Sequence, residues 1–155
     1  MRHLKLIAAA LLVLGCTPKE EITCYTDYVD PKIGSGGHGH VFVGANVPFG
    51  MVQLGPTSIP QEWDWCSGYH DSDSTVIGFS HTHLSGTGIG DLFDITVMPV
   101  VGEVTYGRGR EEDPSTGMWS YADRSREVTR PGYYSVPLTR YGITAEMTAT
   151  NRVGL

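Results

Sequence analysis

Residues 143–150 alternate between apolar and polar side chains along their whole length. The apolar members, each followed by a threonine or a glutamate, are Ile143, Ala145, Met147 and Ala149. Because successive side chains of a strand point to opposite faces, this period of two predicts a strand with one buried face and one face in water. A strand of this kind needs partners, so the pattern directs the chain toward β structure.

The rest of the chain after residue 24 consists of short apolar stretches separated by turn residues. The sequence contains 20 glycines and 9 prolines, which favour many turns and few long helices. Further strands are predicted at residues 41–43, 51–54, 75–79 and 133–138, and a buried strand is predicted at 92–101. Residues 107–125 are charged and predict a surface loop or the tip of a hairpin. Short strands at this spacing predict an all-β domain with the architecture of an antiparallel β-sandwich.

The N-terminus has the features of an export signal. Arg2 and Lys5 precede an unbroken apolar run at residues 6–14 that is too short to span a bilayer. The run leads into Val13-Leu14-Gly15-Cys16, which resembles the cleavage box of bacterial lipoproteins, where the cysteine is lipidated. An ordinary signal peptide with an incidental cysteine is the alternative. We therefore expect a lipoprotein signal peptide at 1–15, a tether at 16–24, and a β-sandwich domain at 25–155 whose pattern breaks off at its C-terminus.

The charge and the cysteines limit the partners of the exported chain. Removing residues 1–15 takes Lys+Arg from 11 to 9 and leaves Asp+Glu at 17, so the formal net charge moves from −6 to −8. Such an acidic domain is a poor partner for nucleic acid or anionic lipid, and contact with a membrane is expected only through a lipid anchor. Cys24 and Cys66 remain, and whether they form a disulfide stays open.

Three clusters of glycine, histidine and aromatic residues carry the functional signal. They lie at residues 34–40, where the sequence reads GSGGHGH, at 63–70, where it reads WDWCSGYH, and at 78–91, where it reads GFSHTHLSGTGIGD. Tryptophan offers a flat apolar face that suits the C–H face of a sugar, and glycine allows the backbone to approach a ligand closely. Trp63 and Trp65 would share one face of a strand. These residue types together predict a carbohydrate pocket.

The histidines also allow a metal site as a rival interpretation. His81 and His83 are two residues apart, and His38, His40 and His70 bring the number in the mature chain to five. The sequence shows no carboxylate at an obvious ligand position among them, so histidines bonded to loop backbone are the expected structural role. Asp71 and Asp73 are expected to form turns, and the sequence marks no acid and base pair of the kind that glycoside hydrolysis needs.

The three clusters, read with the residues around them, resemble a known family. YVDPKIGSGGHGHVFVGANVPFGMVQLGP, WDWCSGYH and IGFSHTHLSGTGIGDLFDITVMP are similar to the N-terminal domain of glycoside hydrolase family 92. The resemblance implies an exported bacterial α-mannosidase, often specific for α-1,2 bonds, that degrades mannose-containing glycans such as N-glycans. It implies an N-terminal β-sandwich packed on a C-terminal (α/α)6 barrel, and calcium-dependent inversion by a glutamate acid and an aspartate base.

The resemblance also implies which residues of this chain face the substrate. Both catalytic carboxylates and the calcium ligands would belong to the C-terminal barrel, so no catalytic or metal-binding residue is expected in this chain. Trp65 is the first choice and Trp63 the second for contact with the leaving-group sugar. The pocket wall would be formed by Cys66, His70, Gly37, His38, His83, Gly88 and Asp91.

Two functional hypotheses follow from these observations. In the first, the chain is the substrate-facing domain of an exported, lipid-anchored α-mannosidase at the periplasmic or outer side of a bacterial membrane, and is inactive without its barrel. In the second, it is a non-catalytic carbohydrate-binding or interaction module. A face shaped to pack against a barrel would be exposed in isolation, so residues 17–155 alone are expected to be poorly soluble.

Overall fold

The alternating segment at the C-terminus forms one strand of a hairpin. In a computed structural model, which describes residues 24–155 except 111 and 114, β7 (Tyr133–Leu138) pairs antiparallel with β8 (Ile143–Thr148). The register runs from Tyr133 opposite Thr148 to Leu138 opposite Ile143. β6 (Val128–Arg130) adds to the other edge of β7, giving the order β6-β7-β8. The predictions at 133–138 and 143–150 are confirmed, with β8 two residues shorter than expected.

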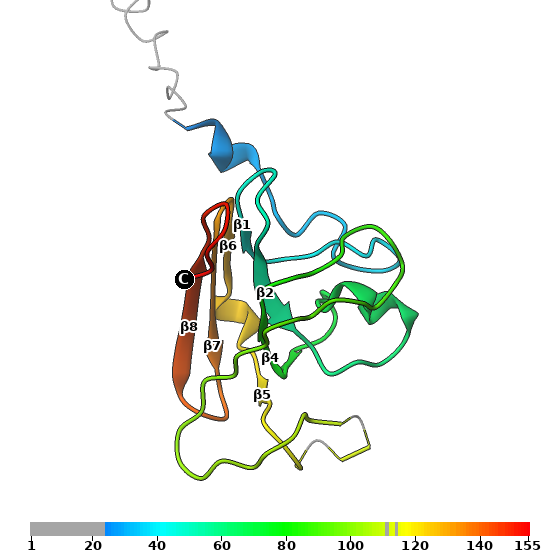
Figure 1. The fold of residues 1–155 in the computed structure, drawn as a ribbon, viewed down its shortest axis with the longest axis vertical. Coiled ribbons are helices and arrows are strands. Elements are labelled where there is room, and N and C mark those ends of the chain that lie inside the picture. Colours follow the sequence, from blue (N-terminus) through cyan, green and yellow to red (C-terminus); the bar gives the residue numbers. More distant parts are fainter. Residues whose placement is uncertain (1–23, 111, 114) are drawn as a thin grey trace, which may run out of the picture.

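A second three-stranded antiparallel sheet faces the first (Figure 1). It has the order β1-β2-β4 and contains β1 (Ala45–Asn46), β2 (Gln53–Thr57) and β4 (Gly78–Ser80). A smaller ladder joins β3 (Thr75–Val76) to β5 (Ser120–Tyr121). The prediction of an all-β, antiparallel fold is confirmed. The expected signal peptide 1–15, Cys16 and most of the tether lie outside the described residues.

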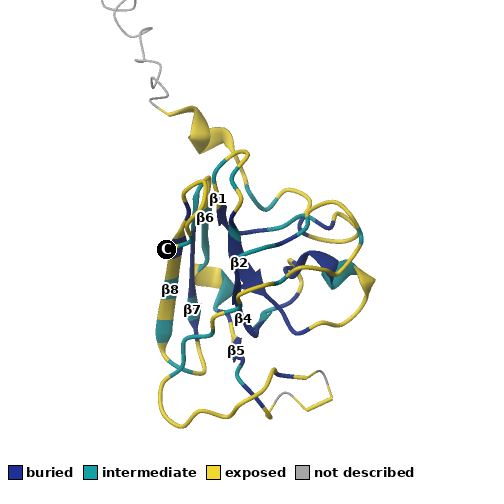
Figure 2. Cartoon of the chain, viewed as in Figure 1, coloured by how far each residue is buried: buried dark blue, intermediate teal, exposed yellow. Residues whose placement is uncertain are grey.

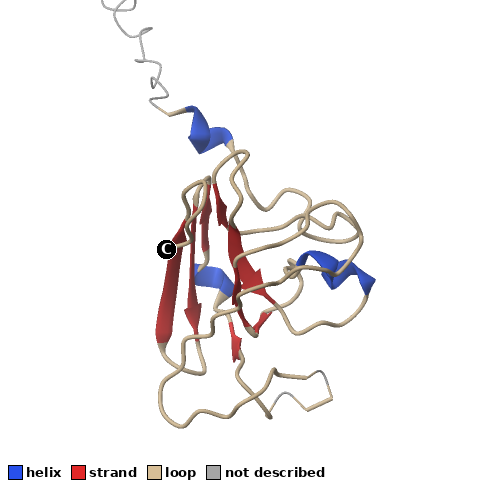
Figure 3. Cartoon of the chain, in the orientation of Figure 1, coloured by secondary structure: helices blue, strands red, loops and turns tan. Residues whose placement is uncertain are grey.

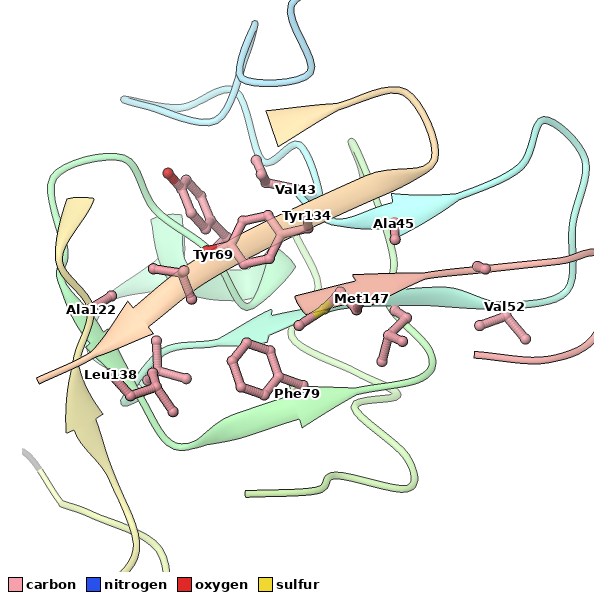
Figure 4. Close-up of a cluster of buried hydrophobic side chains, with 13 residues drawn as sticks. Val43, Ala45, Val52, Tyr69, Phe79, Ala122, Tyr134, Leu138 and Met147 are labelled. Carbon is pink, nitrogen blue, oxygen red and sulfur yellow. The ribbon is translucent and has the colours of Figure 1, made fainter. Parts of the chain in front are cut away.

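The hydrophobic core fills the space between the two sheets (Figure 4). Tyr134 and Leu138 of β7 and Met147 of β8 contribute from one sheet, and Phe79 of β4 contributes from the other. Tyr134 and Leu138 have no exposed surface. Full burial of one such side chain stabilises a fold by about 1.5–3 kcal/mol, so this layer holds the two sheets together and fixes the loops at their ends.

In the described part of the chain, helical structure is limited to three short 3₁₀ turns (Figure 3). They are η1 (Tyr25–Tyr28), η2 (Trp63–Ser67) and η3 (Arg124–Arg126). Within the described part of the chain, no helix has the length and apolar character needed to cross a membrane. The expectation that the two tryptophans share a strand face is wrong, because η2 carries both. At three residues per turn, side chains two apart point in different directions.

Other segments also depart from the sequence prediction. Residues 92–101 form no strand, and Leu92, Phe93 and Ile95 have φ angles of 70°, 56° and 52°, which extended strands exclude. A single bridge joins Val97 to Phe79 of β4, and another joins Leu92 to His83 beyond the end of that strand. Residues 41–43 precede β1 without forming a strand, and the strand expected at 51–54 is β2, displaced toward the C-terminus. The loop expected at 107–125 contains β5 and the buried Trp119.

Candidate functional site

The candidate site is built around η2, among the long loops that lie beside β2 on the side away from β7 and β8 (Figure 1). The turn ends at Gly68, whose φ of 81° is left-handed, and the N–H of Gly68 bonds to the carbonyl of Trp65. A Cβ at this glycine would lie 2.9 Å from the ring of Phe93. Glycine is therefore required both for the backbone angle and for the close approach of the neighbouring loop.

The two tryptophans of η2 have different environments. Trp63 is 61% exposed, and its indole Nε1 donates to the carbonyl of Gly88 at 2.8 Å. Trp65 is half-buried: its Nε1 donates to Oδ2 of Asp73 at 2.7 Å and its ring stacks on His70 at 4.3 Å between centroids. Figure 2 shows this change along η2, from an exposed start to a buried end. Trp63 is thus the indole with the more open face.

A cavity of about 340 Å³ lies beside η2. Trp63, Trp65 and Cys66, three of the predicted site residues, line it. Sequence reasoning did not select other members of its wall, which include Glu62, Phe93 and Arg108. The cavity therefore combines aromatic surface with one acidic and one basic side chain, a composition that can hold a ligand with both apolar faces and hydroxyl groups.

The glycine-rich loop after β4 packs against η2. A Cβ at Gly88 would lie 3.1 Å from the ring of Trp63, and one at Gly90 would lie 3.6 Å from Cα of Cys66. The N–H of Gly86 donates to the carbonyl of His40 at 2.6 Å, which joins this loop to the first histidine cluster. Asp91 is exposed, and its Oδ1 accepts from the N–H of Leu92. The three sequence clusters thus meet in space.

Three histidines are used for backbone contacts, as the sequence analysis expected. His81 and His83 donate from Nδ1 to the carbonyls of Ile95 and Gln53, both at 2.8 Å. His70 accepts at Nδ1 from the N–H of Ser72, so its Nε2 donates to the carbonyl of Gly37. The idea that His81 and His83 share a strand face is wrong, because β4 ends at Ser80.

His83 lies in the interior beneath η2. It is 4% exposed, and its ring packs between Phe42 and Phe93 at 4.8 and 5.4 Å. Burial lowers the pKa of His83 to about 4, although its bond to the carbonyl of Gln53 opposes the change. The imidazole is therefore neutral at pH 7, with its proton on Nδ1, because the carbonyl of Gln53 can only accept.

His38 and His40 converge on one carboxylate oxygen. Nδ1 of His38 and Nε2 of His40 each lie 2.8 Å from Oδ1 of Asp64. The hydrogen bond to Asp64 raises the pKa of His38, and the bond from His38 lowers the pKa of Asp64. Sequence reasoning did not connect these residues, although Asp64 stands between the two tryptophans of the WDWCSGYH motif.

Neither cysteine of the domain is in a disulfide: Cys24 is exposed and Cys66 is buried. Among the described residues, one group of at least three potential metal-ligand side chains is present, and it consists of His38, His40 and Asp64. Calcium takes six to eight oxygen ligands, so this group with two nitrogen donors does not fit calcium. No step through calcium is assigned to this chain.

Comparisons with known proteins agree with this architecture. The Glycosyl hydrolase family 92 N-terminal domain matches residues 28–155. An uncharacterized secreted glycosidase of Arthroderma benhamiae is 32% identical over 134 residues, which are 83% of this chain and 16% of that protein. The chain belongs to glycosyl hydrolase family 92, of which it contains the N-terminal domain.

Solved structures extend the likeness to three dimensions. The family GH92 α-mannosidase of Bacteroides thetaiotaomicron, solved alone and with mannoimidazole, is 45% identical with a TM-score of 0.78. The match covers 83% of this chain and 17% of that enzyme. A second GH92 glycosyl hydrolase, ccman5, is 27% identical with a TM-score of 0.69, covering 84% of this chain and 18% of its own. The described domain thus corresponds to a small part of each relative.

Proposed function

We propose that this chain is the substrate-facing N-terminal domain of an exported, calcium-dependent, inverting α-1,2-mannosidase that acts on mannose-containing glycans, including N-glycans. The observation that carries the proposal is the indole of Trp63, 61% exposed and adjoining a cavity of about 340 Å³. The solved relative that is 45% identical is an α-mannosidase that binds mannoimidazole. Family membership and an open aromatic surface together support a sugar-contacting role for this domain.

The contribution of this domain is binding and orientation. The indole face of Trp63 packs on the C–H face of the leaving-group sugar and excludes water from it, while its N–H remains bonded to Gly88. Glu62 and Arg108, which line the same cavity, offer an acceptor and donors for sugar hydroxyls. Inversion requires an acid and a base carboxylate about 6.5–9.5 Å apart, and we assign both to the C-terminal domain.

Export and anchoring are part of the same proposal. The relative from Arthroderma benhamiae is described as a secreted glycosidase, which supports export of this chain. The charged start, the apolar run and Cys16 support removal of residues 1–15 and a lipid anchor on the new N-terminus. Radiolabelled palmitate incorporation that is lost on Cys16→Ala is the result expected for the anchor.

The enzymatic role is tested with the full-length protein that the gene encodes. We expect Trp63→Ala to lower kcat/KM for an α-1,2-mannobioside by about 10–100-fold, which is about 1.4–2.7 kcal/mol of transition-state binding, while Trp63→Phe keeps most of the activity. Trp65→Ala serves as the comparison for the less exposed indole. An unchanged kcat/KM in Trp63→Ala would show that this side chain does not contact the substrate.

The alternative role as a carbohydrate-binding module gives a different result. If the 155-residue chain binds mannose or mannobiose with quenching of its tryptophan fluorescence, and the full-length protein hydrolyses no α-mannoside, the binding function stands and the mannosidase function fails. Hydrolysis by the 155-residue chain itself would contradict the assignment of both catalytic carboxylates to the other domain.

A further inference from the structure

The cluster of His38, His40 and Asp64 has the composition of a transition-metal site. The two liganding nitrogens each lie 2.8 Å from Oδ1 of Asp64, and all three ligand atoms lie within 4.8 Å of one another. Imidazole nitrogen and carboxylate oxygen are ligands of Zn²⁺, and three protein ligands with one open position is a common arrangement around this ion. The family's implied calcium does not explain the cluster, because calcium prefers oxygen ligands.

The backbone holds the two histidines on one side of the loop. Glycine is required between them, because a Cβ at Gly39 would lie 2.0 Å from the carbonyl oxygen of Gly34. His40 has a φ of 54°, a left-handed angle that is uncommon for a residue other than glycine. Such an angle persists when the surrounding structure enforces it, and it is concentrated at functional sites.

Contacts with both neighbouring clusters enforce this conformation. The carbonyl of His40 accepts from the N–H of Gly86 at 2.6 Å and from the hydroxyl of Ser67. The imidazole of His40 meets the ring of Trp63 edge-on at 4.2 Å between centroids. His40 is therefore fixed in place before any ion binds, and it is 7% exposed. A ligand of this kind loses little conformational entropy on binding.

The third ligand comes from a different part of the chain. Asp64 lies in η2, 24 residues after His40, and its side chain is 17% exposed. The side chain of His38 is 80% exposed, so the cluster is open to solvent on that side. An ion can enter there, and a water molecule or a ligand oxygen can complete its coordination.

We propose that Nδ1 of His38, Nε2 of His40 and Oδ1 of Asp64 bind one Zn²⁺ ion. Ligand atoms around a tetrahedral zinc ion with bonds of about 2.0 Å lie about 3.3 Å apart, so the present separations of 2.8 Å need to widen by about half an ångström. Each liganding nitrogen uses its lone pair for the metal, so the proton that now bridges it to Asp64 is lost from that nitrogen. The imidazole binds in its neutral form with one proton on the other ring nitrogen: a charged ring already carries that proton and releases the bridging one to solvent, and a neutral ring changes tautomer by exchange with solvent.

The ion cross-links the histidine loop to η2 and restrains Trp63. Trp63 precedes Asp64 in the chain and contacts His40, so a metal bond between Asp64 and His40 holds the indole from both sides. Zinc binding is therefore expected to raise the fluorescence anisotropy of Trp63 and the melting temperature of the domain. This site stands on its own geometry and does not depend on which glycan the protein acts on.

The test uses the full chain without a histidine tag. Zn²⁺ is titrated in competition with a chromophoric chelator, and bound zinc is counted after gel filtration by atomic emission. We expect one equivalent per chain with a Kd in the micromolar range or tighter. We expect His38→Ala and Asp64→Asn each to weaken binding by at least tenfold. Both changes preserve the fold, because His38 is exposed and Asn has the shape of Asp.

His81→Ala is the matched control, since His81 lies outside the cluster and contacts the carbonyl of Ile95. Its zinc affinity should equal that of the unchanged chain. Co²⁺ in place of zinc should give the visible absorption of a tetrahedral site, and this absorption should be absent in Asp64→Asn. No stoichiometric zinc, or equal binding in all three variants, overturns the proposal and leaves the cluster as a hydrogen-bonded network only. Loss in His81→Ala alone overturns it by placing the ion elsewhere.

Discussion

The indole N–H of Trp63 donates to the carbonyl of Gly88 at 2.8 Å, and this bond joins η2 to the glycine-rich loop. The two residues also touch through the ring, because a Cβ at Gly88 would lie 3.1 Å from Cζ2 and 3.2 Å from Nε1 of Trp63. Gly88 has a φ of 69°. The orientation of the exposed indole therefore depends on a position where only glycine fits without strain.

We expect Gly88→Ala to destabilise the chain and to displace Trp63. The left-handed angle costs an alanine about 1–2 kcal/mol, and the added methyl pushes on the indole. Gly86→Ala is the matched control, because Gly86 has a φ of 75° and nothing within 4 Å of its Cβ position. Urea unfolding should show a lower free energy of unfolding in both variants. The emission of Trp63, obtained by subtracting the spectrum of the Trp63→Phe variant, should change only in Gly88→Ala. Equal emission in both would contradict the contact.

The stability of the chain should depend on the charge of His83. Burial lowers the pKa of this histidine to about 4, below the value of about 6.5 in an unfolded chain. The unfolded state binds more protons between these two values, so the free energy of unfolding rises with pH across this window. The contribution is fully present above pH 6.5 and is lost progressively down to pH 4, by about 3 kcal/mol in total.

Unfolding free energies of the unchanged chain and of His83→Asn, measured from pH 7.5 to pH 4, test this dependence. The asparagine lowers stability at every pH because it leaves space beside Phe42 and Phe93, so the slope and not the absolute value is the readout. We expect the slope between pH 6.5 and 4 to be smaller in the variant. Parallel curves would mean that other groups cause the acid sensitivity.

Ile95 combines exposed apolar surface with an unfavourable backbone angle. It is 73% exposed, and its φ is 52°, a conformation that β-branched residues disfavour and asparagine tolerates. Ile95→Asn should raise stability by about 1 kcal/mol and reduce self-association of the chain. Val101→Asn is the control, since Val101 is 66% exposed without a positive φ. It should reduce self-association, measured by light scattering, with stability within 0.5 kcal/mol.

The sequence predicted the hairpin well because its signal is local. Residues 133–138 and 143–148 pair with each other, so the alternation that buries one face is visible in the strands themselves. The prediction of a strand at residues 92–101 failed for the opposite reason. Their apolar composition suggested a buried strand, but Leu92 and Ile95 are exposed at left-handed angles that no composition reveals. Contacts with distant segments, and not propensity, determine the path of this loop.

The candidate site was predictable in composition and not in arrangement. Glycine, histidine and tryptophan at three clusters indicated a pocket, and the structure brings these clusters together. His38 and His40 both contact Asp64, although they precede it by 26 and 24 positions in the sequence. The loop that brings them there has left-handed backbone angles at Gly37 and His40. A single sequence does not show which residue besides glycine adopts such an angle, so Asp64 was not recognised as their partner.

A buried carboxylate accepts hydrogen bonds from two tyrosines of the core. The side chain of Glu127 is 2% exposed, accepts from the hydroxyls of Tyr69 and Tyr134 and from Arg124, and forms an ion pair with Nζ of Lys32 at 3.3 Å. Burial raises the pKa of Tyr69 to about 12, so this hydroxyl remains a donor at physiological pH. All four groups that surround the carboxylate are donors, and two of them are positively charged.

We expect Glu127→Gln to cost about 3–5 kcal/mol, because it leaves Arg124 largely buried without its counter-charge and turns an amide N–H toward other donors. Glu146→Gln is the matched control: Glu146 is exposed on β8 and accepts only from Tyr133 among the described residues, so its loss should stay within about 0.5 kcal/mol. Urea unfolding of both variants at pH 7.5 measures the difference. If both variants lose the same small amount of unfolding free energy, then solvent reaches Glu127 and replaces its charged partners. Apolar packing alone would then stabilise the core.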